Sequence, residues 1–264
     1  MKNLQAFEKT LKQFEALFGY TPKNLKAVRC FLPKTKVMVV SPHPDDEILS
    51  GGLALRLQAE NRCHVINIAV TLGSDPSRKT ARRKELAKAV SFLKWDNYVL
   101  PENWSEKEQK LVALLKKERP SLIIAPHKND YHPTHIRTSE LLSRAIAKSR
   151  VDTQVAWAEY WSPQERPNLM IGLSRESLMK QVHALTFHKG EVARNPYHLL
   201  LPAWQMDSVR RGSEWLAGKG ARGASFVFGQ LYRLEKFQTG RPIRQPASAT
   251  IMGLSSDLGE LLVK

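Results

Sequence analysis

The sequence is poor in cysteine and has no long hydrophobic run. Its two cysteines, Cys30 and Cys63, lie far apart and outside any C-x-x-C pair, so neither a disulfide framework nor a thiolate zinc site is favoured. Lysines interrupt the apolar residues near the N-terminus, unlike the continuous stretch of a signal peptide. No segment approaches the roughly 20 apolar residues of a membrane-spanning helix. These absences predict a cytoplasmic protein without a transmembrane segment.

Acidic residues are scarce relative to basic ones. The 264 residues include 41 Lys and Arg against 25 Asp and Glu, which gives a formal net charge of +16. Such an excess attracts phosphates, acidic sugars or anionic surfaces. A basic surface that only keeps the protein soluble is the other explanation, and the charge identifies no reaction.

Apolar spacing predicts alternating strands and helices. We expect an amphipathic helix in the first 20 residues, strands at 36–40, 64–71, 97–100, 121–125 and 154–160, and helices at 48–59, 78–95, 105–118 and 134–148. Ser105 is the expected cap of the third of these later helices. The alternation predicts an α/β fold, a Rossmann-like three-layer, doubly wound and mainly parallel sheet. Ligands of such sheets bind beyond the carboxyl ends of the strands.

The chain is expected to form a single domain. Residues 1–33 would supply a helix and a connection through Pro22, residues 34–162 the α/β core, and residues 163–264 a C-terminal elaboration. In this last part the pattern predicts helices at 174–187 and 204–216 and antiparallel hairpin strands within 225–237. It makes no assignment beyond residue 239.

Two segments that follow predicted strands are rich in His and Asp. Residues 41–47 read SPHPDDE, and residues 126–135 read PHKNDYHPTH. Burying unpaired charges costs several kcal/mol or more, so packing does not explain the first segment. Imidazole and carboxylate groups are good zinc ligands, and a catalytic zinc usually takes three of them. An Asp that merely caps a helix beginning near Ile48 is the structural alternative, which the second histidine pair weakens.

The two motifs resemble those of the LmbE-like or PIG-L family of zinc-dependent N-acetylglucosaminyl deacetylases, over roughly the first 160 residues. The resemblance implies that His43, Asp46 and His135 bind Zn²⁺. It implies that Asp45 is the general base that activates water, and that His132 stabilises the oxyanion or protonates the leaving amine. The same ligands would also accept iron, cobalt or nickel.

Other residues follow the family pattern less closely. Arg82, which forms an Arg-x-x-Glu pair with Glu85, is implied to contact the substrate. Thr134 stands where the family often has an Asp that orients the catalytic imidazole, and Asp130 is the candidate replacement. The C-terminal third matches loosely through His183, His188 and Glu191, and we expect His188 to be a surface residue. His127 is expected to be either a loop residue that supports His135 or a ligand, and is left out of the predicted ligand set.

The implied function is hydrolysis of the acetamide of an N-acetylglucosamine-type sugar or glycoconjugate. A basic cluster between Arg78 and Lys88 would favour a phosphorylated or otherwise anionic substrate if it borders the site, although a solvated helix face is the more common role. Trp104, Trp157 and Trp161 could stack on sugar rings, but core packing is the more usual role of Trp. The sequence leaves open whether the chain forms a homo-oligomer.

Two rival functions remain. One is an amidase that acts on a sugar-thiol conjugate or another N-acyl amine. The other is a basic protein that binds polyanions and uses its metal structurally, which the absence of any nucleic-acid-binding motif disfavours. A nucleotide-binding Rossmann protein is also disfavoured, because no G-x-G-x-x-G follows the first strand.

Overall fold

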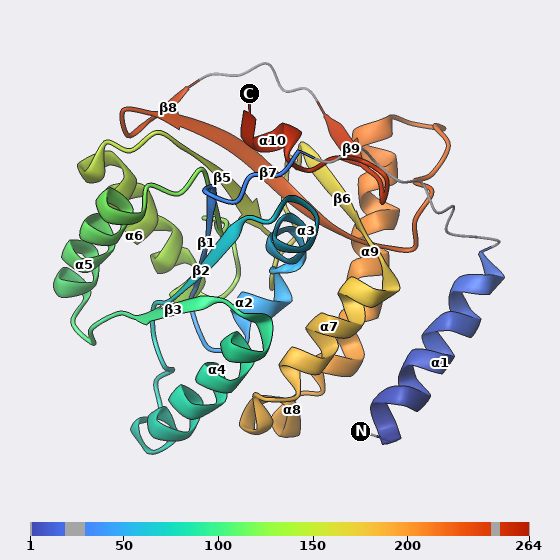
Figure 1. The fold of residues 1–264 in the computed structure, drawn as a ribbon, viewed down its shortest axis with the longest axis horizontal. Coiled ribbons are helices and arrows are strands. Elements are labelled where there is room, and N and C mark those ends of the chain that lie inside the picture. Colours follow the sequence, from blue (N-terminus) through green and yellow to red (C-terminus); the bar gives the residue numbers. More distant parts are fainter. Residues whose placement is uncertain (1, 19–29, 244–248, 264) are drawn as a thin grey trace.

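The centre of the protein is one sheet with helices on both faces (Figure 1). The computed structural model describes residues 2–18, 30–243 and 249–263. Its strands are β1 (Lys36–Ser41), β2 (His64–Ala69), β3 (Asp96–Val99), β4 (Leu122–Pro126), β5 (Thr153–Ala158), β6 (Leu169–Leu173), β7 (Phe228–Gln238), β8 (Arg241–Ile243) and β9 (Thr250–Met252). They are ordered β3-β2-β1-β4-β5-β7-β6-β9, with β8 paired to β7.

Most neighbouring strands run parallel. β1 pairs with β2 and β4, β2 with β3, β4 with β5, and β6 with β9, all in parallel, whereas β7 is antiparallel to β5, β6 and β8. The expected fold class, an α/β structure with a mainly parallel sheet, is confirmed.

The sequence of β1 explains why it lies at the centre. Alternate residues of a strand face opposite sides of the sheet. Val37 and Val39 pack into the core on one face, and Met38 and Val40 into the core on the other. All four are fully buried, which is the pattern of a parallel strand covered on both sides.

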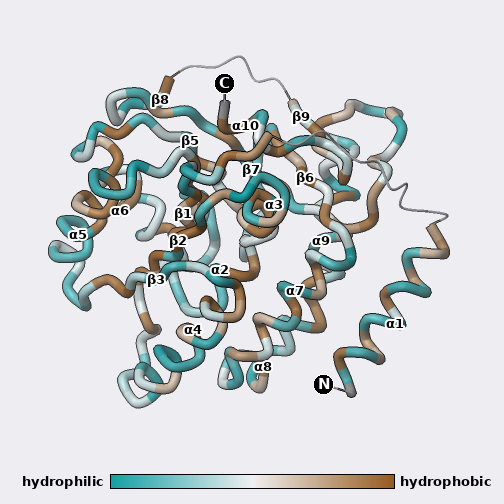
Figure 2. Tube along the Cα trace, viewed as in Figure 1, coloured by the Kyte–Doolittle hydropathy of each residue, from teal (hydrophilic) through white to brown (hydrophobic). Residues whose placement is uncertain are grey.

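The helices divide between these faces. They are α1 (Lys2–Leu17), α2 (Asp46–Leu49), α3 (Gly52–Asn61), α4 (Lys79–Leu93), preceded by a 3₁₀ turn at Pro76–Arg78, α5 (Trp104–Glu118), α6 (Pro133–Ser149), α7 (Arg175–Leu185), α8 (Lys189–Arg194), α9 (Tyr197–Ala217) and α10 (Glu260–Val263). Apolar residues of α2, α3, α4 and α7 pack on the side of Val37, and those of α5 and α6 on the side of Met38. Figure 2 shows hydrophobic residues along the central strands and alternating hydrophobic and hydrophilic residues along the outer helices.

The N-terminal helix is present and packs on α7, as expected. Its Leu11 is buried, and its Glu15 pairs with Arg175 at the start of α7. Most of the expected connection, including Pro22, lies outside the described residues. Among the described residues, no helix combines the length and apolar character needed to cross a membrane.

Two expected helices differ in detail. The helix predicted at 48–59 is two helices, α2 and α3, separated at Ser50 and Gly51. A Cβ at Gly51 would lie 2.4 Å from the carbonyl oxygen of Glu47, so the chain needs glycine for this break. The cap of α5 is Asn103 and not Ser105, because the Asn103 side chain accepts from the backbone N–H groups of Ser105 and Glu106.

The C-terminal third completes the sheet. The helix expected at 174–187 is the slightly shorter α7, and the helix expected at 204–216 lies within the longer α9, but the hairpin predicted within 225–237 is wrong in extent. That segment forms one strand, β7, which inserts between β5 and β6, and its hairpin partner β8 lies beyond it. The sequence patterns missed β6, the apolar run at Leu169–Leu173, whose five residues are too few to show a period.

Candidate metal centre and active site

The two His- and Asp-rich segments meet at one edge of the sheet. The first follows β1, and the second follows β4 and leads into α6. Because β1 and β4 are parallel neighbours, their carboxyl ends open at the same edge. The fold therefore brings together residues that lie about 90 positions apart in the chain.

Three imidazoles form a cluster there. One ring nitrogen from each of His43, His132 and His135 can be chosen so that all three lie within 4.8 Å of one another. The ring centroids are 4.9 Å apart for His43 and His132, 5.4 Å for His43 and His135, and 5.0 Å for His132 and His135. His135 is fully buried, and the other two are partly exposed.

Asp46 joins two of these histidines. Its Oδ2 lies 3.2 Å from His43 Nδ1 and 3.2 Å from His135 Nε2. Ligand atoms of a tetrahedral zinc, each about 2.0–2.2 Å from the ion, lie about 3.3–3.5 Å from one another. The donor spacing therefore fits such an ion, and the assignment of His43, Asp46 and His135 as its ligands stays a prediction.

The buried ring of His135 also fits a metal ligand. Within the described part of the chain, neither of its nitrogens makes a well-aligned hydrogen bond, although carboxylate oxygens lie 3.2 Å from Nε2 and 3.7 Å from Nδ1. Such nitrogens are normally paired when buried. Burial lowers the pKa of His135, but the neighbouring Asp46 and Asp130 outweigh burial and raise that pKa to about 10. Burial likewise raises the pKa of Asp46, but His135 and His43 outweigh it and hold that pKa well below its ordinary value. A cation is favoured at this position.

Asp45, the predicted base, adopts an unusual backbone conformation. Its φ is 108°, a region that favours glycine, and its side chain is almost fully buried. Its backbone N–H donates to Glu47 Oε2 at 2.8 Å. Burial, followed by the charges of Asp46 and Glu47, raises the pKa of the Asp45 carboxyl well above its ordinary value.

His188 supports the turn that contains Asp45. The expectation that His188 lies on the surface is wrong. It is fully buried, and its Nε2 lies 2.8 Å from Glu47 Oε1. Glu47, also fully buried, thus links His188 to the backbone of Asp45. The reason is tertiary, because His188 lies at the start of the short helix α8, which brings it into contact with Glu47 from 141 residues away.

A second chain of contacts runs from α8 to the same turn. Glu191, buried in α8, lies 3.5 Å from an Arg82 nitrogen, and Arg82 donates to the carbonyl oxygen of Pro44 at 3.1 Å. Glu191 also pairs with Arg78 and Arg194, each at 2.6 Å. Arg82 also lines a cavity that contains Asp45 and the three histidines, and its role in substrate binding stays a prediction.

The sequence patterns gave Glu47 and Glu191 no role of their own. Glu47 itself could have indicated that a partner was needed. It directly follows the predicted metal-binding residues, and a buried carboxylate needs a buried partner.

The loop before α6 is arranged by Asp130. Its Oδ1 accepts from the backbone N–H of His132 at 2.8 Å and lies 3.7 Å from His135 Nδ1. Asp130 thus supports the main chain of His132, whereas the ring of His132 accepts from the backbone N–H of Thr134 through Nδ1 at 3.2 Å. His127 is outside the cluster, with its Nε2 2.9 Å from the carbonyl oxygen of Ser162.

A cavity of about 730 Å³ opens over the cluster. Its walls include Asp45, Asp46 and the three histidines on one side. The cations on its walls are Lys79, Arg82, Lys107, Arg137 and Arg194. This volume is in the range of cavities that bind small molecules.

The family and structural comparisons agree with this arrangement. Residues 38–146 match the PIG-L family, GlcNAc-PI de-N-acetylase, and this segment contains both motifs. The N,N'-diacetylchitobiose deacetylase of Pyrococcus horikoshii is 19% identical, with a TM-score of 0.60 over 89% of this chain and 93% of that one. The zinc-inhibited teicoplanin deacetylase Orf2 is 14% identical, with a TM-score of 0.56 over 76% of this chain and 98% of that one.

A third solved structure has a different activity. GalB, the 4-carboxy-2-hydroxymuconate hydratase of Pseudomonas putida KT2440, is 16% identical, with a TM-score of 0.61 over 76% of this chain and 95% of that one. At these identities the likeness shows a shared fold and not a shared reaction. A search of curated proteins finds no significant match to this chain.

Proposed function

We propose, on the premise that residues 38–146 are a PIG-L (LmbE-like) family segment, that this protein is a zinc-dependent deacetylase of an N-acetylglucosamine-type sugar or glycoconjugate. The observation that carries the proposal is the convergence of His43, Asp46 and His135 beside the predicted base Asp45, within one cavity. Zinc in such a site acts as a Lewis acid on the acetamide carbonyl and lowers the pKa of water to about 7. Iron, cobalt and nickel suit the same donors.

Asp45 is the group best placed to take a proton from the attacking water. Its carboxyl lines the cavity next to Asp46, whose Oδ2 is already engaged with two histidines. Burial raises the pKa of Asp45, which brings it closer to the pH at which a general base works best. The two adjacent aspartates thus have separate roles, Asp46 as a ligand and Asp45 as a base.

His132 is suited to donate a hydrogen bond. Its Nδ1 accepts from the backbone N–H of Thr134, so the neutral ring carries its proton on Nε2. Burial, followed by the charges of His43 and His135, lowers the pKa of His132 and favours this neutral form. A protonated Nε2 is a poor metal ligand, but as a hydrogen-bond donor it can stabilise the oxyanion. To protonate the leaving amine, the ring must first take up a second proton during the reaction, such as the one removed from the attacking water.

The cationic side chains that line the cavity favour a substrate that carries an anionic group. Lys79 pairs with Glu102, and Arg82 and Arg194 pair with Glu191. Among the described residues, no carboxylate pairs with Lys107 or Arg137. Arg137 lies over the Trp104 ring, 3.8 Å from its centroid, where its charge remains available to a phosphate or carboxylate.

A substrate panel tests the function. The zinc-loaded protein is incubated with N-acetylglucosamine, its phosphates and its nucleotide conjugates, and free amine and acetate are measured. We expect equal amounts of both products, and we expect Asp45→Asn to lower kcat by about 10²–10⁴-fold with zinc still bound. If Asp45→Asn retained wild-type turnover with its full metal content, the assignment of Asp45 as the general base would be wrong.

The same panel separates the rival functions. Cleavage of a sugar-thiol conjugate or another N-acyl amine, with no activity on acetylated hexosamines, would favour the related amidase. Tight polyanion binding without any amine release would favour a structural metal in a polyanion-binding protein.

The anionic group is tested by salt. We expect kcat/KM for a phosphorylated substrate to fall as ionic strength rises, and Arg137→Gln to reduce this dependence. Equal salt dependence in Arg137→Gln and the wild type would assign the effect to other charges.

A further inference from the structure

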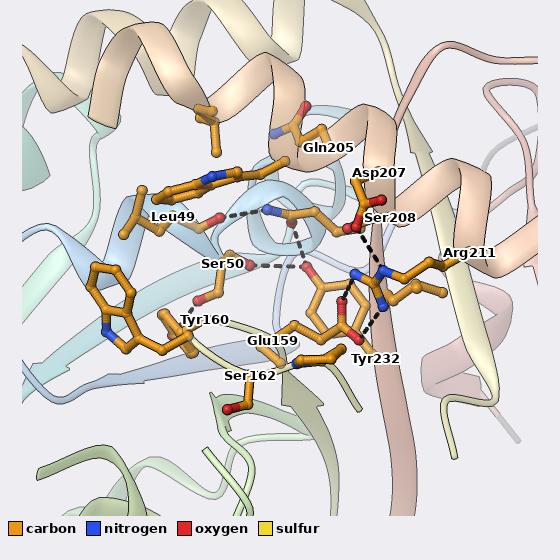
Figure 3. Close-up of a pocket in the computed structure, with 17 residues that line it drawn as sticks. Leu49, Ser50, Glu159, Tyr160, Ser162, Gln205, Asp207, Ser208, Arg211 and Tyr232 are labelled. Carbon is orange, nitrogen blue, oxygen red and sulfur yellow. Dashed lines mark hydrogen bonds and ion pairs between the residues drawn. The ribbon is translucent and has the colours of Figure 1, made fainter. Parts of the chain in front are cut away.

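A second cavity lies beside the catalytic one. It has a volume of about 390 Å³, and Trp161 lines both cavities. Figure 3 shows its interior, with Ser50 and Tyr160 on one side and Asp207 and Arg211 on the other. The ring of Tyr160 also contacts the ring of His135, with centroids 4.9 Å apart. Because Trp161 lines both, the two cavities are neighbours that share one aromatic wall.

Trp161 is a fixed aromatic surface at this junction. It is 44% exposed, although its ring contacts Tyr197 and Trp204 with centroids 5.9 and 6.4 Å away. Its backbone N–H donates to Asp130 Oδ2 at 3.2 Å, and the other oxygen of that carboxylate accepts from the backbone of His132. One carboxylate therefore sets the positions of both the tryptophan and the predicted proton donor.

The charged side chains that line the second cavity are paired with one another. Arg211 contacts Glu159 through two bonds, 2.9 Å from Oε1 and 2.6 Å from Oε2, and its Nε lies 2.8 Å from Asp207 Oδ2. The side chains of Arg211 and Glu159 are 16% and 11% exposed, so they reach the cavity without being mobile surface groups. A carboxylate oxygen has more than one lone pair, and these oxygens can still accept from a hydroxyl group.

We propose that this second cavity binds a second sugar ring, covalently linked to the ring that is deacetylated. The proposal rests on the deacetylase function proposed above. An aromatic face at the entrance and hydrogen-bonding charges beyond it match the apolar face and the hydroxyl groups of a pyranose.

Other occupants fit the cavity less well. An alkyl chain would bury Glu159, Asp207 and Arg211 without replacing their water contacts, which is unfavourable. A phosphate would meet two carboxylates and one arginine, since these are the charged residues on the cavity wall. The charges therefore favour a neutral polyol.

The test compares affinities for one ring and for two. N-acetylglucosamine and N,N'-diacetylchitobiose are titrated calorimetrically into the zinc-loaded Asp45→Asn protein, in which turnover is slow. We expect the disaccharide to bind about 3–10-fold more tightly, the range expected for one aromatic contact. Trp161→Ala and Arg211→Lys should each remove most of this difference.

Arg210→Lys is the matched control. Arg210 is the neighbour of Arg211 on α9 and also pairs with Asp207, but it does not line the cavity. We expect this variant to keep the preference for the disaccharide. Equal affinity for the two sugars, or a preference that survives both Trp161→Ala and Arg211→Lys, would overturn the proposal.

Turnover is measured in parallel with the zinc-loaded wild-type protein on the same two sugars. Amine release without a disaccharide preference in binding would refute the proposed subsite and support the proposed deacetylase function. A disaccharide preference that the variants abolish, without amine release, would support a sugar-binding site in this cavity and refute the proposed deacetylase function. Failure of both measurements would remove both proposals.

Discussion

Replacement of His188 by alanine tests how the catalytic turn is held in place. The His188 ring and the Glu47 carboxylate are both fully buried and lie 2.8 Å apart. Removal of one partner of such a pair leaves an uncompensated polar group and typically costs about 3–5 kcal/mol of stability. We expect His188→Ala to lower the free energy of unfolding by an amount in this range.

The same change should affect the predicted base. Glu47 Oε2 accepts from the backbone N–H of Asp45, whose φ of 108° is a conformation that costs about 1–3 kcal/mol unless its surroundings hold it. Without His188, Glu47 is free to shift and the turn can relax. Loss of a residue that orients a metal site lowers activity by about 10–100-fold. We expect a fall of this size in kcat with little change in KM.

The assay combines urea unfolding with steady-state kinetics on the zinc-loaded protein. His183→Ala is the control, because the His183 ring packs against Phe92 and Phe187, and in the described parts of the chain it forms no ring contact with the histidine cluster. His188→Gln, which keeps a donor toward Glu47, should restore part of kcat. A stability loss with kcat unchanged at temperatures where His188→Ala is folded would refute the positioning role and leave the pair purely structural.

Two further predictions concern protonation and helix capping. In the metal-free protein, the stabilisation that comes from the raised pKa of His135 is complete below pH 6.5 and is lost as the pH rises toward about 10, so the free energy of unfolding should fall across this window. Metal binding at pH 8 should release the His135 proton, and calorimetry in buffers of different ionisation enthalpy would show no such release if the interpretation were wrong. Asn103→Ala should destabilise the protein by about 1 kcal/mol through loss of the α5 cap, whereas Ser105→Ala should change stability by less than about 0.5 kcal/mol. A larger loss of stability for Ser105→Ala than for Asn103→Ala in chemical denaturation would identify Ser105 as the cap.

The two His- and Asp-rich motifs were readable from sequence because their chemistry is local. Residues 41–47 place two aspartates and a histidine directly after a buried strand, and this placement alone indicated a site at the strand end. The second histidine pair follows another strand in the same way. Because parallel strands open at one edge, the meeting of the two motifs followed from the predicted fold.

Helix ends were less predictable than helix positions. The period of apolar residues locates a helix, but its exact start depends on which side chain accepts from the first free backbone N–H groups. Asn103 and Ser105 are both good caps by residue type, and only the backbone conformation selects Asn103. In the same way, the break at Gly51 depends on how closely the Glu47 carbonyl approaches.

The sequence by itself determined the fold class, the central strands and the two motifs, because each of these is encoded by neighbouring residues with a recognisable period or composition. Only the tertiary structure decided that His188 is buried against Glu47, which lies 141 residues away, and that Trp161 lines two cavities. The physical reason is that these roles depend on contacts between distant segments, and no local pattern records which distant side chain will complete a buried charge or line a cavity.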